Sequence, residues 1–268
     1  MCAPDYFGVD YVINPWMDGQ IGTVDHARSV QQWTSLHDIL KNKVGAEIAL
    51  VPPQAGLPDM VFTANAGVVR QDRVVPAKFR HSERQGEEPF FVKWFTEHSF
   101  KVGPVSCAFE GAGDALAWLH TDSGSTLFAA AGFRTDVGSH AEVANWLDVE
   151  TVSLNLVDPR FYHLDTCFCP LPSGHLIWFP AAFDDASQQK VIDRIPGRMR
   201  KAVSEIDAKN FACNAVGSPE AIVLHKASSE LEAWLDRVGY TVYQTPLDEF
   251  LKAGGSAKCL TLRLNEPI

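Results

Sequence analysis

Residues 26–52, HARSVQQWTSLHDILKNKVGAEIALVP, contain the stretch that decides the fold class. Within 26–43, apolar side chains recur at spacings of three and four residues and form one apolar helix face: Val30, Trp33, Leu36, Ile39 and Leu40. The short apolar segment 47–52 (EIALVP) ends in a turn residue and predicts a strand. A helix followed by a strand is one step of an alternating α/β pattern.

The same alternation continues along the chain. We predict strands or strand–loop units at 47–52, 61–69, 107–119, 125–133, 151–157, 166–179, 221–225, 240–244 and 258–264. Further helical patterns lie at 90–100, 139–147, 188–201 and 228–238. This order favours an α/β fold over a β-sandwich. The helical patterns recur at intervals of about 40–60 residues, which is typical of repeated βα units, but we find no motif that repeats from unit to unit.

Length and composition indicate one packed domain. The chain has 268 residues, of which 46% are hydrophobic and 21% are charged, and these values exclude disorder and fibrous structure. No Ser/Gly linker or low-complexity block divides it, so we expect a single domain over residues 1–268. The net charge of −10 disfavours nucleic acid and anionic membranes as partners and mildly favours a cationic small molecule.

Cysteine usage and the first residues predict a cytosolic protein. The opening MCAPDYFGVDY has neither a basic region nor an apolar run, and no segment reaches the ~18–20 apolar residues of a membrane span. None of the six cysteines forms a CxxC, and the pair Cys167 and Cys169 has no histidine at zinc-finger spacing. We therefore expect reduced thiols and no metal site.

Cys259 is the first candidate for chemistry. It follows two glycines in GGSAKCLTL (254–262) and opens an apolar segment, which predicts a partly exposed thiol where a loop meets a strand. The neighbouring Lys258 can stabilise a thiolate and thereby lower the pKa of the thiol. The alternative is a small buried core residue, which is the commonest place for a free cysteine.

Acids and a histidine occur in two further motifs. In FYHLDT, strand alternation places His163 and Asp165 on one face about 7 Å apart, as in an oriented general acid/base. In FEGAGDAL, Glu110 and Asp114 are separated by glycines that allow close backbone approach. This motif lacks the GxxxxGK[ST] and GxGxxG patterns of phosphate-binding loops. The alternatives are a solvated surface pair and an ordinary turn.

Amides and a further acid lie near the predicted strand at 61–69. Asp59 and Asn65 stand at opposite ends of the apolar part of LPDMVFTANAG, and Asn14 precedes a proline that fixes the local backbone. Each is also a common turn former. In combination, a thiol, a histidine and several carboxylates indicate Cys–His nucleophilic chemistry. A guanidinium is a suitable substrate group, because it is planar, always charged and matched by bidentate carboxylates.

Four motifs, in the order VFTANAG, FEGAGDAL, FYHLDTCF and GGSAKCLTL, resemble the amidinotransferase/dimethylarginine dimethylaminohydrolase family of guanidine-modifying enzymes in the pentein superfamily. The opening segment 2–17 is similar to the branch that includes the cyanobacterial arginine dihydrolase domains. The resemblance runs from residue 2 to about residue 264. It implies an α/β propeller of five ββαβ-type units around a pseudo-fivefold axis, with the site in a central channel.

The resemblance also implies roles for the candidate residues. Cys259 matches the family nucleophile, His163 matches its catalytic histidine, and Glu110 and Asp59 match the carboxylates that hold the guanidinium. The expected catalytic set is therefore Cys259, His163 and Glu110. The other residues expected at the substrate are Asp165 as a further acid, Arg84 and Arg134 at the substrate α-carboxylate, and Asp114, Asn65 and Asn14.

Asn65 bears on which reaction the resemblance implies. The arginine deiminases and dimethylarginine hydrolases that this chain resembles usually have Asp there, whereas the arginine dihydrolases have Asn and also use the residue matching Asn14. An amide can donate a hydrogen bond to a carbonyl oxygen, whereas an ionised carboxylate only accepts. We therefore expect an arginine dihydrolase that forms a Cys259 thiouronium intermediate and releases ornithine, ammonia and carbon dioxide. No metal or cofactor is expected, because the guanidinium is already an activated electrophile.

Several alternatives stay open. Single hydrolysis would give citrulline from arginine or dimethylarginine, and amidino transfer would require a site that excludes water from the intermediate. A non-catalytic pentein binding module is the alternative outside the enzymes, although function follows the site rather than the fold. The cyanobacterial dihydrolases continue into a further C-terminal module, and this sequence stops at Ile268, so a coupled downstream reaction stays open. The sequence also allows a homo-oligomer.

Overall fold

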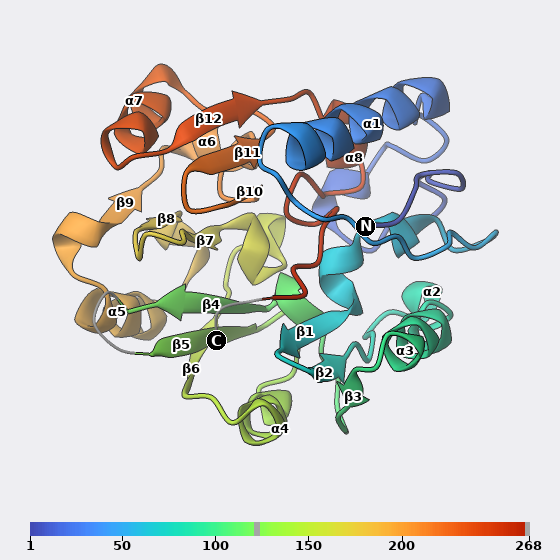
Figure 1. Ribbon diagram of the computed structural model, residues 1–268, viewed down its shortest axis with the longest axis horizontal. Coiled ribbons are helices and arrows are strands. Elements are labelled where there is room, and N and C mark those ends of the chain that lie inside the picture. Colours follow the sequence, from blue (N-terminus) through green and yellow to red (C-terminus); the bar gives the residue numbers. More distant parts are fainter. Residues whose placement is uncertain (121–123, 266–268) are drawn as a thin grey trace.

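The computed structural model describes residues 1–120 and 124–265, and their strands form four sheets of three strands each (Figure 1). In each sheet the first two strands are antiparallel neighbours, and the third strand lies parallel to the second. The sheets are β1 (Gly67–Arg70), β2 (Arg73–Pro76) and β3 (Lys101–Val102); β4 (Ala115–Leu119), β5 (Ser125–Ala131) and β6 (Thr151–Asn155); β7 (Phe168–Pro170), β8 (Leu176–Trp178) and β9 (Arg200–Ala202); and β10 (Val216–Gly217), β11 (Ala221–Leu224) and β12 (Thr241–Gln244).

A helix of nine or ten residues connects the second strand of each sheet to the third, because parallel neighbours cannot be joined by a hairpin. Each sheet therefore belongs to a ββαβ unit. Figure 1 shows these connecting helices, together with α1, on the outside of the sheets. Of the helices described, none is both long and apolar enough to cross a membrane. The connecting helices are α3 (Glu88–Glu97), α4 (Gly138–Leu147), α5 (Asp185–Arg194) and α7 (Ser229–Arg237), and the others are α1 (His26–Asn42), α2 (Ser82–Gln85), α6 (Glu205–Lys209) and α8 (Asp248–Leu251).

Helix α1 lies between two segments that also run parallel. Asp25 caps its N-terminus by accepting a hydrogen bond from the backbone N–H of Arg28, which satisfies one of the free donors of the first turn. Cys2 before the helix and Val51 after it pair in a single parallel bridge. The buried side chains of α1 include Trp33, Leu36 and Leu40, which belong to the face that the spacing predicts.

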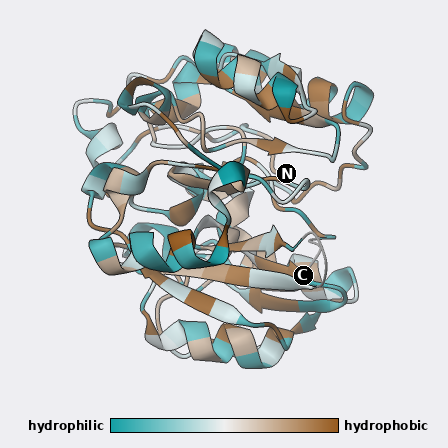
Figure 2. Ribbon diagram, turned by 90° about the vertical axis from the view of Figure 1, so that its left-hand side faces the viewer, coloured by the Kyte–Doolittle hydropathy of each residue, from teal (hydrophilic) through white to brown (hydrophobic). Residues whose placement is uncertain are grey.

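Three of the four described sheets contribute to one apolar core, whereas the sheet of β1, β2 and β3 packs in two other clusters. Phe128 on β5, Phe168 on β7 and Leu176 on β8 are fully buried in the same cluster, and the two phenylalanine rings lie 5.1 Å apart. Figure 2 shows apolar residues along the strands and hydrophilic residues on the outer helices. Since burying each such side chain stabilises the fold by about 1.5–3 kcal/mol, this core fixes one sheet relative to the next.

Short turns precede the first strand of each sheet, and three of them pack together. The 3₁₀ turn η3 (Thr63–Ala66) contacts η4 (Gly111–Gly113), and η4 contacts η6 (Leu164–Thr166). Gly111 has a φ of +61°, and a Cβ there would lie 2.6 Å from the backbone nitrogen of Gly67. The turns can pack this closely only because residue 111 has no side chain.

The structure confirms the α/β class and most helices but corrects several strands. Residues 47–50 form no strand, and Val51 forms only the bridge to Cys2. The segment 258–264 also forms no strand, because residues 256–261 turn with hydrogen bonds such as Leu260 N–H to Ser256 O. In the segments 61–69 and 107–119, the strands begin only at Gly67 and Ala115.

One helix is shorter than predicted, and several elements were not predicted. The pattern at 188–201 predicts a helix that α5 does not complete, since α5 ends at Arg194. Pro196 explains this end, because a proline disfavours helical geometry at the residue before it. The strands β3, β9 and β10 have only two or three residues, too few for an alternation to be recognised, and β2 (RVVP) does not alternate.

We expect Gly111→Ala to lower stability more than Gly56→Ala. Both glycines have positive φ, +61° and +79°, so an alanine at either site costs about 1–2 kcal/mol of left-handed strain. Only at position 111 would the new Cβ also meet the backbone of η3, whereas no atom lies within 4 Å of a Cβ at position 56. Thermal unfolding of both variants measures the difference, and equal losses in Tm would contradict the packing argument.

Candidate active site

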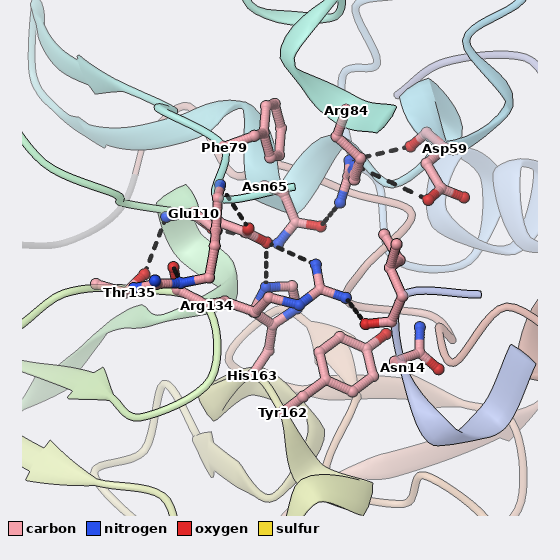
Figure 3. Close-up of polar contacts among 12 residues, drawn as sticks. Asn14, Asp59, Asn65, Phe79, Arg84, Glu110, Arg134, Thr135, Tyr162 and His163 are labelled. Atoms are coloured by element: carbon pink, nitrogen blue, oxygen red, sulfur yellow. Dashed lines mark hydrogen bonds and ion pairs between the residues drawn. The ribbon is translucent and has the colours of Figure 1, made fainter. Parts of the chain in front are cut away.

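The predicted site residues lie at or directly behind a small cavity where the central turns meet, and Figure 3 shows the part of the site that contains Asp59, Arg134 and His163. Each of the ten is buried, with at most 8% of its surface exposed. Glu110, Asp114 and Asp165 lie behind the wall of the cavity, where Glu110 and Asp114 contact His163 and Asp165 contacts Cys259. The wall is formed by Ile13, Asn14, Met17, Asp59, Phe62, Asn65, Arg84, Arg134, Tyr162, His163, Ala253, Gly255 and Cys259.

His163 is oriented by a buried glutamate. Its Nε2 lies 2.7 Å from Glu110 Oε2, and Arg134 Nη1 lies 3.1 Å from the same oxygen. Burial opposes ionisation of Glu110, but the charges of Arg134 and His163 outweigh it and hold the pKa of this carboxyl well below its usual range. Glu110 is therefore an anion that can stabilise the protonated imidazole. This is the arrangement expected of an oriented general acid/base.

Asp114 supports the turn that carries His163. Its Oδ2 accepts a hydrogen bond from Thr135 Oγ1 at 2.7 Å, and its Oδ1 accepts one from Leu164 N–H at 3.0 Å. Burial raises the pKa of Asp114 to about 6, although nearby His163 acts in the opposite direction. Asp114 is not one of the residues that line the cavity.

Cys259 lies in a turn and is buried, in contrast to the partly exposed thiol predicted at the start of a strand. Only 3% of its surface is exposed. Its Sγ lies 3.4 Å from Asp165 Oδ2 and 3.0 Å from Asn214 Nδ2. Burial raises the pKa of the thiol well above its usual value, and the charge of Asp165 raises it further. The sequence-based expectation of a lowered pKa is therefore wrong for this structure.

Asp165 and His163 do not share a face of one strand as predicted. Residues Leu164–Thr166 form the turn η6, so the imidazole points to Glu110 and the carboxylate points to Cys259. Burial raises the pKa of Asp165 to about 7, and the charge of Lys258 opposes this rise. The Oδ1 atom of Asp165 is buried and has no hydrogen-bond partner.

Arg84 joins several acids and amides on one side of the cavity. Its Nε and Nη2 each lie 2.8 Å from an oxygen of Glu87, which is a bidentate pair. Its Nη1 donates to Asn65 Oδ1 at 2.8 Å, and its Nη2 donates to the Asp59 carbonyl oxygen at 3.1 Å. Burial raises the pKa of Glu87 to about 7, and Arg84 opposes this rise. Sequence reasoning missed Glu87, although its i,i+3 spacing from Arg84 was a usable signal.

Asp59 keeps one oxygen without a partner. Its Oδ2 accepts a hydrogen bond from Tyr11 at 3.0 Å, whereas Oδ1 is buried and unpartnered. Burial raises the pKa of Asp59, and the charge of Arg84 opposes this rise. Asp59 and Asn65 were predicted at the ends of one strand, but they lie in two consecutive 3₁₀ turns, η2 (Pro58–Val61) and η3.

Arg134 crosses the cavity between two main-chain segments. Its Nη1 contacts Glu110, its Nη2 donates to the carbonyl oxygen of Ile13 at 2.9 Å, and its guanidinium lies 4.7 Å from the centre of the Tyr162 ring. Figure 3 shows this guanidinium between Glu110 and the segment that precedes Asn14. The N-terminal segment and the central turns are therefore tied together through one arginine.

Asn65 and Asn14 use both ends of their amides within the protein. Asn65 Nδ2 donates to the carbonyl oxygen of Glu110 at 3.2 Å, while its Oδ1 accepts from Arg84. Asn14 Oδ1 caps the turn η1 (Pro15–Met17), and its Nδ2 donates to Ala253 O at 3.1 Å. Asn14 is thus a turn former, as its alternative interpretation held, and it also lines the cavity.

The same short motif occurs in two of the turns, although the sequence analysis predicts no motif that repeats from unit to unit. The first unit contains Phe62-Thr-Ala-Asn65-Ala, and the fourth contains Phe211-Ala-Cys-Asn214-Ala. In both, the asparagine N–H donates to the carbonyl oxygen of the phenylalanine three residues earlier. This repeat could have indicated Asn214, which contacts Cys259.

In the described part of the chain, no three His, Cys, Asp or Glu side chains are grouped as metal ligands.

The fold and the buried Cys, His and Glu side chains agree with the guanidine-modifying class that the four motifs resemble. Residues 13–265 match the family model described as "N,N dimethylarginine dimethylhydrolase, eukaryotic". The chain belongs to the dimethylarginine dimethylaminohydrolase family, which confirms the family resemblance.

Solved and curated relatives are similar to this chain over its whole length. The bifunctional arginine dihydrolase/ornithine cyclodeaminase ArgZ of Synechocystis sp. is 53% identical, over all of this chain and 38% of its own length. The chain thus spans about two-fifths of that relative. A substrate-bound cysteine-to-serine variant of the ArgZ N-terminal domain has a TM-score of 0.95 at 51% identity, covering 100% of this chain and 98% of that one. An asparagine-to-serine variant of the same domain, covalently bound to a reaction intermediate, has a TM-score of 0.95 at 51% identity, covering 100% and 97%.

We expect the free energy of unfolding of Asp114→Asn to fall less between pH 4 and pH 6 than that of the wild type. The folded carboxyl keeps its proton up to about pH 6, whereas an unfolded one loses it near ~3.9, so wild-type folding becomes less favourable across this interval. An amide does not titrate and lacks this contribution. Denaturant unfolding at several pH values measures the free energy of unfolding. Asp148→Asn is the control, since that side chain is 90% exposed, and identical slopes in all three proteins would contradict the assignment.

Proposed function

We propose that this chain is an arginine dihydrolase that uses Cys259 as a covalent nucleophile. The observation that carries the proposal is that Cys259, His163 and Asp59 line one small buried cavity, with the anion Glu110 directly behind His163. The relatives support the substrate. ArgZ is named an arginine dihydrolase, and this chain aligns with nearly all of its N-terminal domain.

The guanidinium is expected to bind against the acids. Asp59 Oδ1 has no partner in the protein, so it can accept hydrogen bonds from a planar guanidinium. Burial raises the pKa of Asp59, and a cation bound beside it would favour the ionised form. Glu110 contributes a second negative charge. The predicted roles of Arg84 and Arg134 at the substrate α-carboxylate, and of Asp165, remain part of this proposal.

The first hydrolysis has two halves. The Cys259 thiolate forms a C–S bond to the guanidinium carbon, and His163 gives a proton to the departing nitrogen. Ammonia is released, and an S-alkylthiouronium remains on Cys259. The same histidine then takes a proton from water. The new C–O bond forms, the thiolate leaves, and a ureido group remains.

The second hydrolysis repeats these steps on the ureido carbon. Attack by Cys259 and loss of ammonia leave a thiocarbamate on the sulfur, and water releases a carbamate that decomposes to ornithine and carbon dioxide. Asn65 lines the cavity, and its Nδ2 carries a second N–H besides the one directed to Glu110. That N–H is the donor we assign to the ureido oxygen.

We also propose that the architecture is the five-unit pentein propeller. Four ββαβ units are described above, and α1 with the bridge between Cys2 and Val51 has the helix and parallel pairing of a fifth. The turn at 256–260 would then precede the first strand of that unit, as η3, η4 and η6 precede theirs. The single domain over 1–268, the cytosolic location and a homo-oligomer likewise remain predictions.

Single hydrolysis is the second candidate, since the family model carries the name of a dimethylarginine hydrolase. Product analysis with arginine, citrulline and dimethylarginine separates the candidates. We expect two molecules of ammonia per arginine and accumulation of ornithine. Cys259→Ser serves as the inactive control, because a hydroxyl is a far weaker nucleophile than a thiolate. Citrulline as the stable product would refute the dihydrolase, and no turnover of any of the three would refute the hydrolase.

Asn65→Asp is expected to stop the reaction at citrulline or to abolish it. A carboxylate can still pair with Arg84 but has no N–H to offer the ureido oxygen or the Glu110 carbonyl. Amino-acid analysis after exhaustive digestion of arginine measures this. Asn42→Asp, at an exposed position at the end of α1, is the control and should give wild-type products. Wild-type yields of ornithine from Asn65→Asp would contradict the role of the amide.

A further inference from the structure

Asn214 makes three hydrogen bonds with the turn that contains Cys259. It is fully buried in the turn that precedes β10. Its Nδ2 donates a hydrogen bond to Cys259 Sγ at 3.0 Å, and its Oδ1 accepts one from Cys259 N–H at 3.1 Å. Its carbonyl oxygen accepts a third from Lys258 N–H at 3.2 Å. One residue therefore fixes both the main chain and the sulfur of Cys259.

The orientation of the Asn214 amide follows from the backbone around it. Cys259 N–H needs an acceptor, and the carbonyl oxygen of Asp165, which lies 3.0 Å from Nδ2, needs a donor. Only the orientation with Oδ1 toward Cys259 N–H satisfies both groups. Nδ2 then has one N–H for Asp165 and one for the sulfur. The donor at Sγ is thus imposed by the surrounding main chain.

This donor acts against groups that disfavour a thiolate. Burial raises the pKa of Cys259, and so does Asp165, whose Oδ2 lies 3.4 Å from Sγ. Two hydrogen bonds lower the pKa of Cys259: one from the backbone of Ser256 and one from the side-chain amide of Asn214. A hydrogen bond to an anion is roughly twice as strong as one between neutral groups, so the amide favours the thiolate over the thiol.

Other titratable groups face this region. His163 and Tyr162 line the same cavity as Cys259, and burial keeps the pKa of Tyr162 well above its usual value. Lys258 acts on Asp165 and lowers the pKa of that acid. These groups are unchanged when residue 214 is replaced by alanine, which adds no charge beside the sulfur, so a shift in the titration of Cys259 in that variant can be attributed to loss of the amide.

We propose that Asn214 positions Cys259 for attack and stabilises its thiolate through Nδ2. The inference rests on the proposed function, because it takes Cys259 as the attacking group. Asn214 is not among the residues that line the cavity. Its loss should therefore lower the reactivity of the sulfur more than the binding of the substrate.

The test is the pH dependence of Cys259 alkylation by iodoacetamide, followed by mass spectrometry of the peptide that contains this residue. The whole chain is compared with Asn214→Asp, which keeps the shape but cannot donate once ionised, and Asn214→Ala, which removes the donor. We expect the midpoint to move to higher pH by about one unit or more. The rate at a fixed pH below the midpoint then falls about tenfold, since each unit is a tenfold change in thiolate.

Gln32→Glu is the matched control. Gln32 is also a buried amide, and it bridges Asp248 Oδ1 at 2.7 Å and Glu249 N–H at 3.1 Å, between α1 and α8. Its replacement should leave the midpoint at the wild-type value. Circular dichroism reports the fold of each variant, and if Asn214→Asp does not fold, Asn214→Ala decides. Wild-type midpoints in folded Asn214 variants would overturn the proposal, and so would unfolding of both, which would make Asn214 a structural residue only.

Alkylation requires no substrate, so it separates this inference from the proposed function. A shifted midpoint together with no ammonia from arginine in wild type would refute the proposed function and support the thiolate contact. Unmoved midpoints in a wild type that releases two molecules of ammonia would refute the role of Asn214 alone.

Discussion

The site depends on a carboxylate that is fully buried and nevertheless ionised. Burial favours the protonated form of Glu110, but Arg134 and His163 both contact its Oε2 and reverse that preference. Removing one partner of such a pair would leave a buried charge uncompensated, at a cost of about 3–5 kcal/mol. The three side chains come from the turn before β4, the loop after β5 and the turn before β7. The same ion network that orients the histidine therefore also connects the central turns.

Three neighbouring buried acids have pKa values that shift in the opposite direction from that of Glu110. Asp114 receives hydrogen bonds from a hydroxyl and a backbone N–H, and Asp165 faces a thiol, so burial dominates and raises their pKa values to about 6 and about 7. Glu87 has Arg84 as a partner, yet its pKa also rises to about 7. The buried acids around the cavity thus comprise one that is firmly ionised and three whose pKa values lie at about 6 to about 7. A bound cation would select their ionised forms, since opposite charges favour them.

Periodicity predicted the elements in which side-chain spacing is regular. The face of α1 was predictable because Trp33, Leu36 and Leu40 repeat at helical spacing, and α3, α4 and α7 follow the same rule. The central turns were not predictable, since their apolar residues are buried on all sides and resemble short strands. For this reason the pattern around Asn65 and Cys259 predicts strands where the structure has turns.

The sequence predicts which residues belong to the site, but it does not predict which of them contact one another. Cys259, His163 and the acids stand in distinctive motifs, whereas the contacts Glu110–His163 and Asp165–Cys259 join residues 53 and 94 positions apart in the chain. No local pattern encodes such distances. The exposure and pKa of Cys259 were mispredicted for the same reason: both are set by the segments that pack around it.

The repeated Phe-x-x-Asn-Ala turn shows how one local structure serves two purposes. In both copies the backbone N–H of the asparagine donates to the phenylalanine carbonyl oxygen, and the asparagine side chain is buried. In the first unit its amide meets Arg84 and the Glu110 carbonyl, and in the fourth it meets Cys259 and the Asp165 carbonyl. In each case one N–H satisfies a main-chain oxygen of a neighbouring turn, Glu110 O for Asn65 and Asp165 O for Asn214, which fixes the amide and leaves a second N–H on Nδ2. Repetition of the unit thus supplies two fixed amides, and the difference between their neighbours places one beside Arg84 at the cavity wall and the other beside Cys259 Sγ.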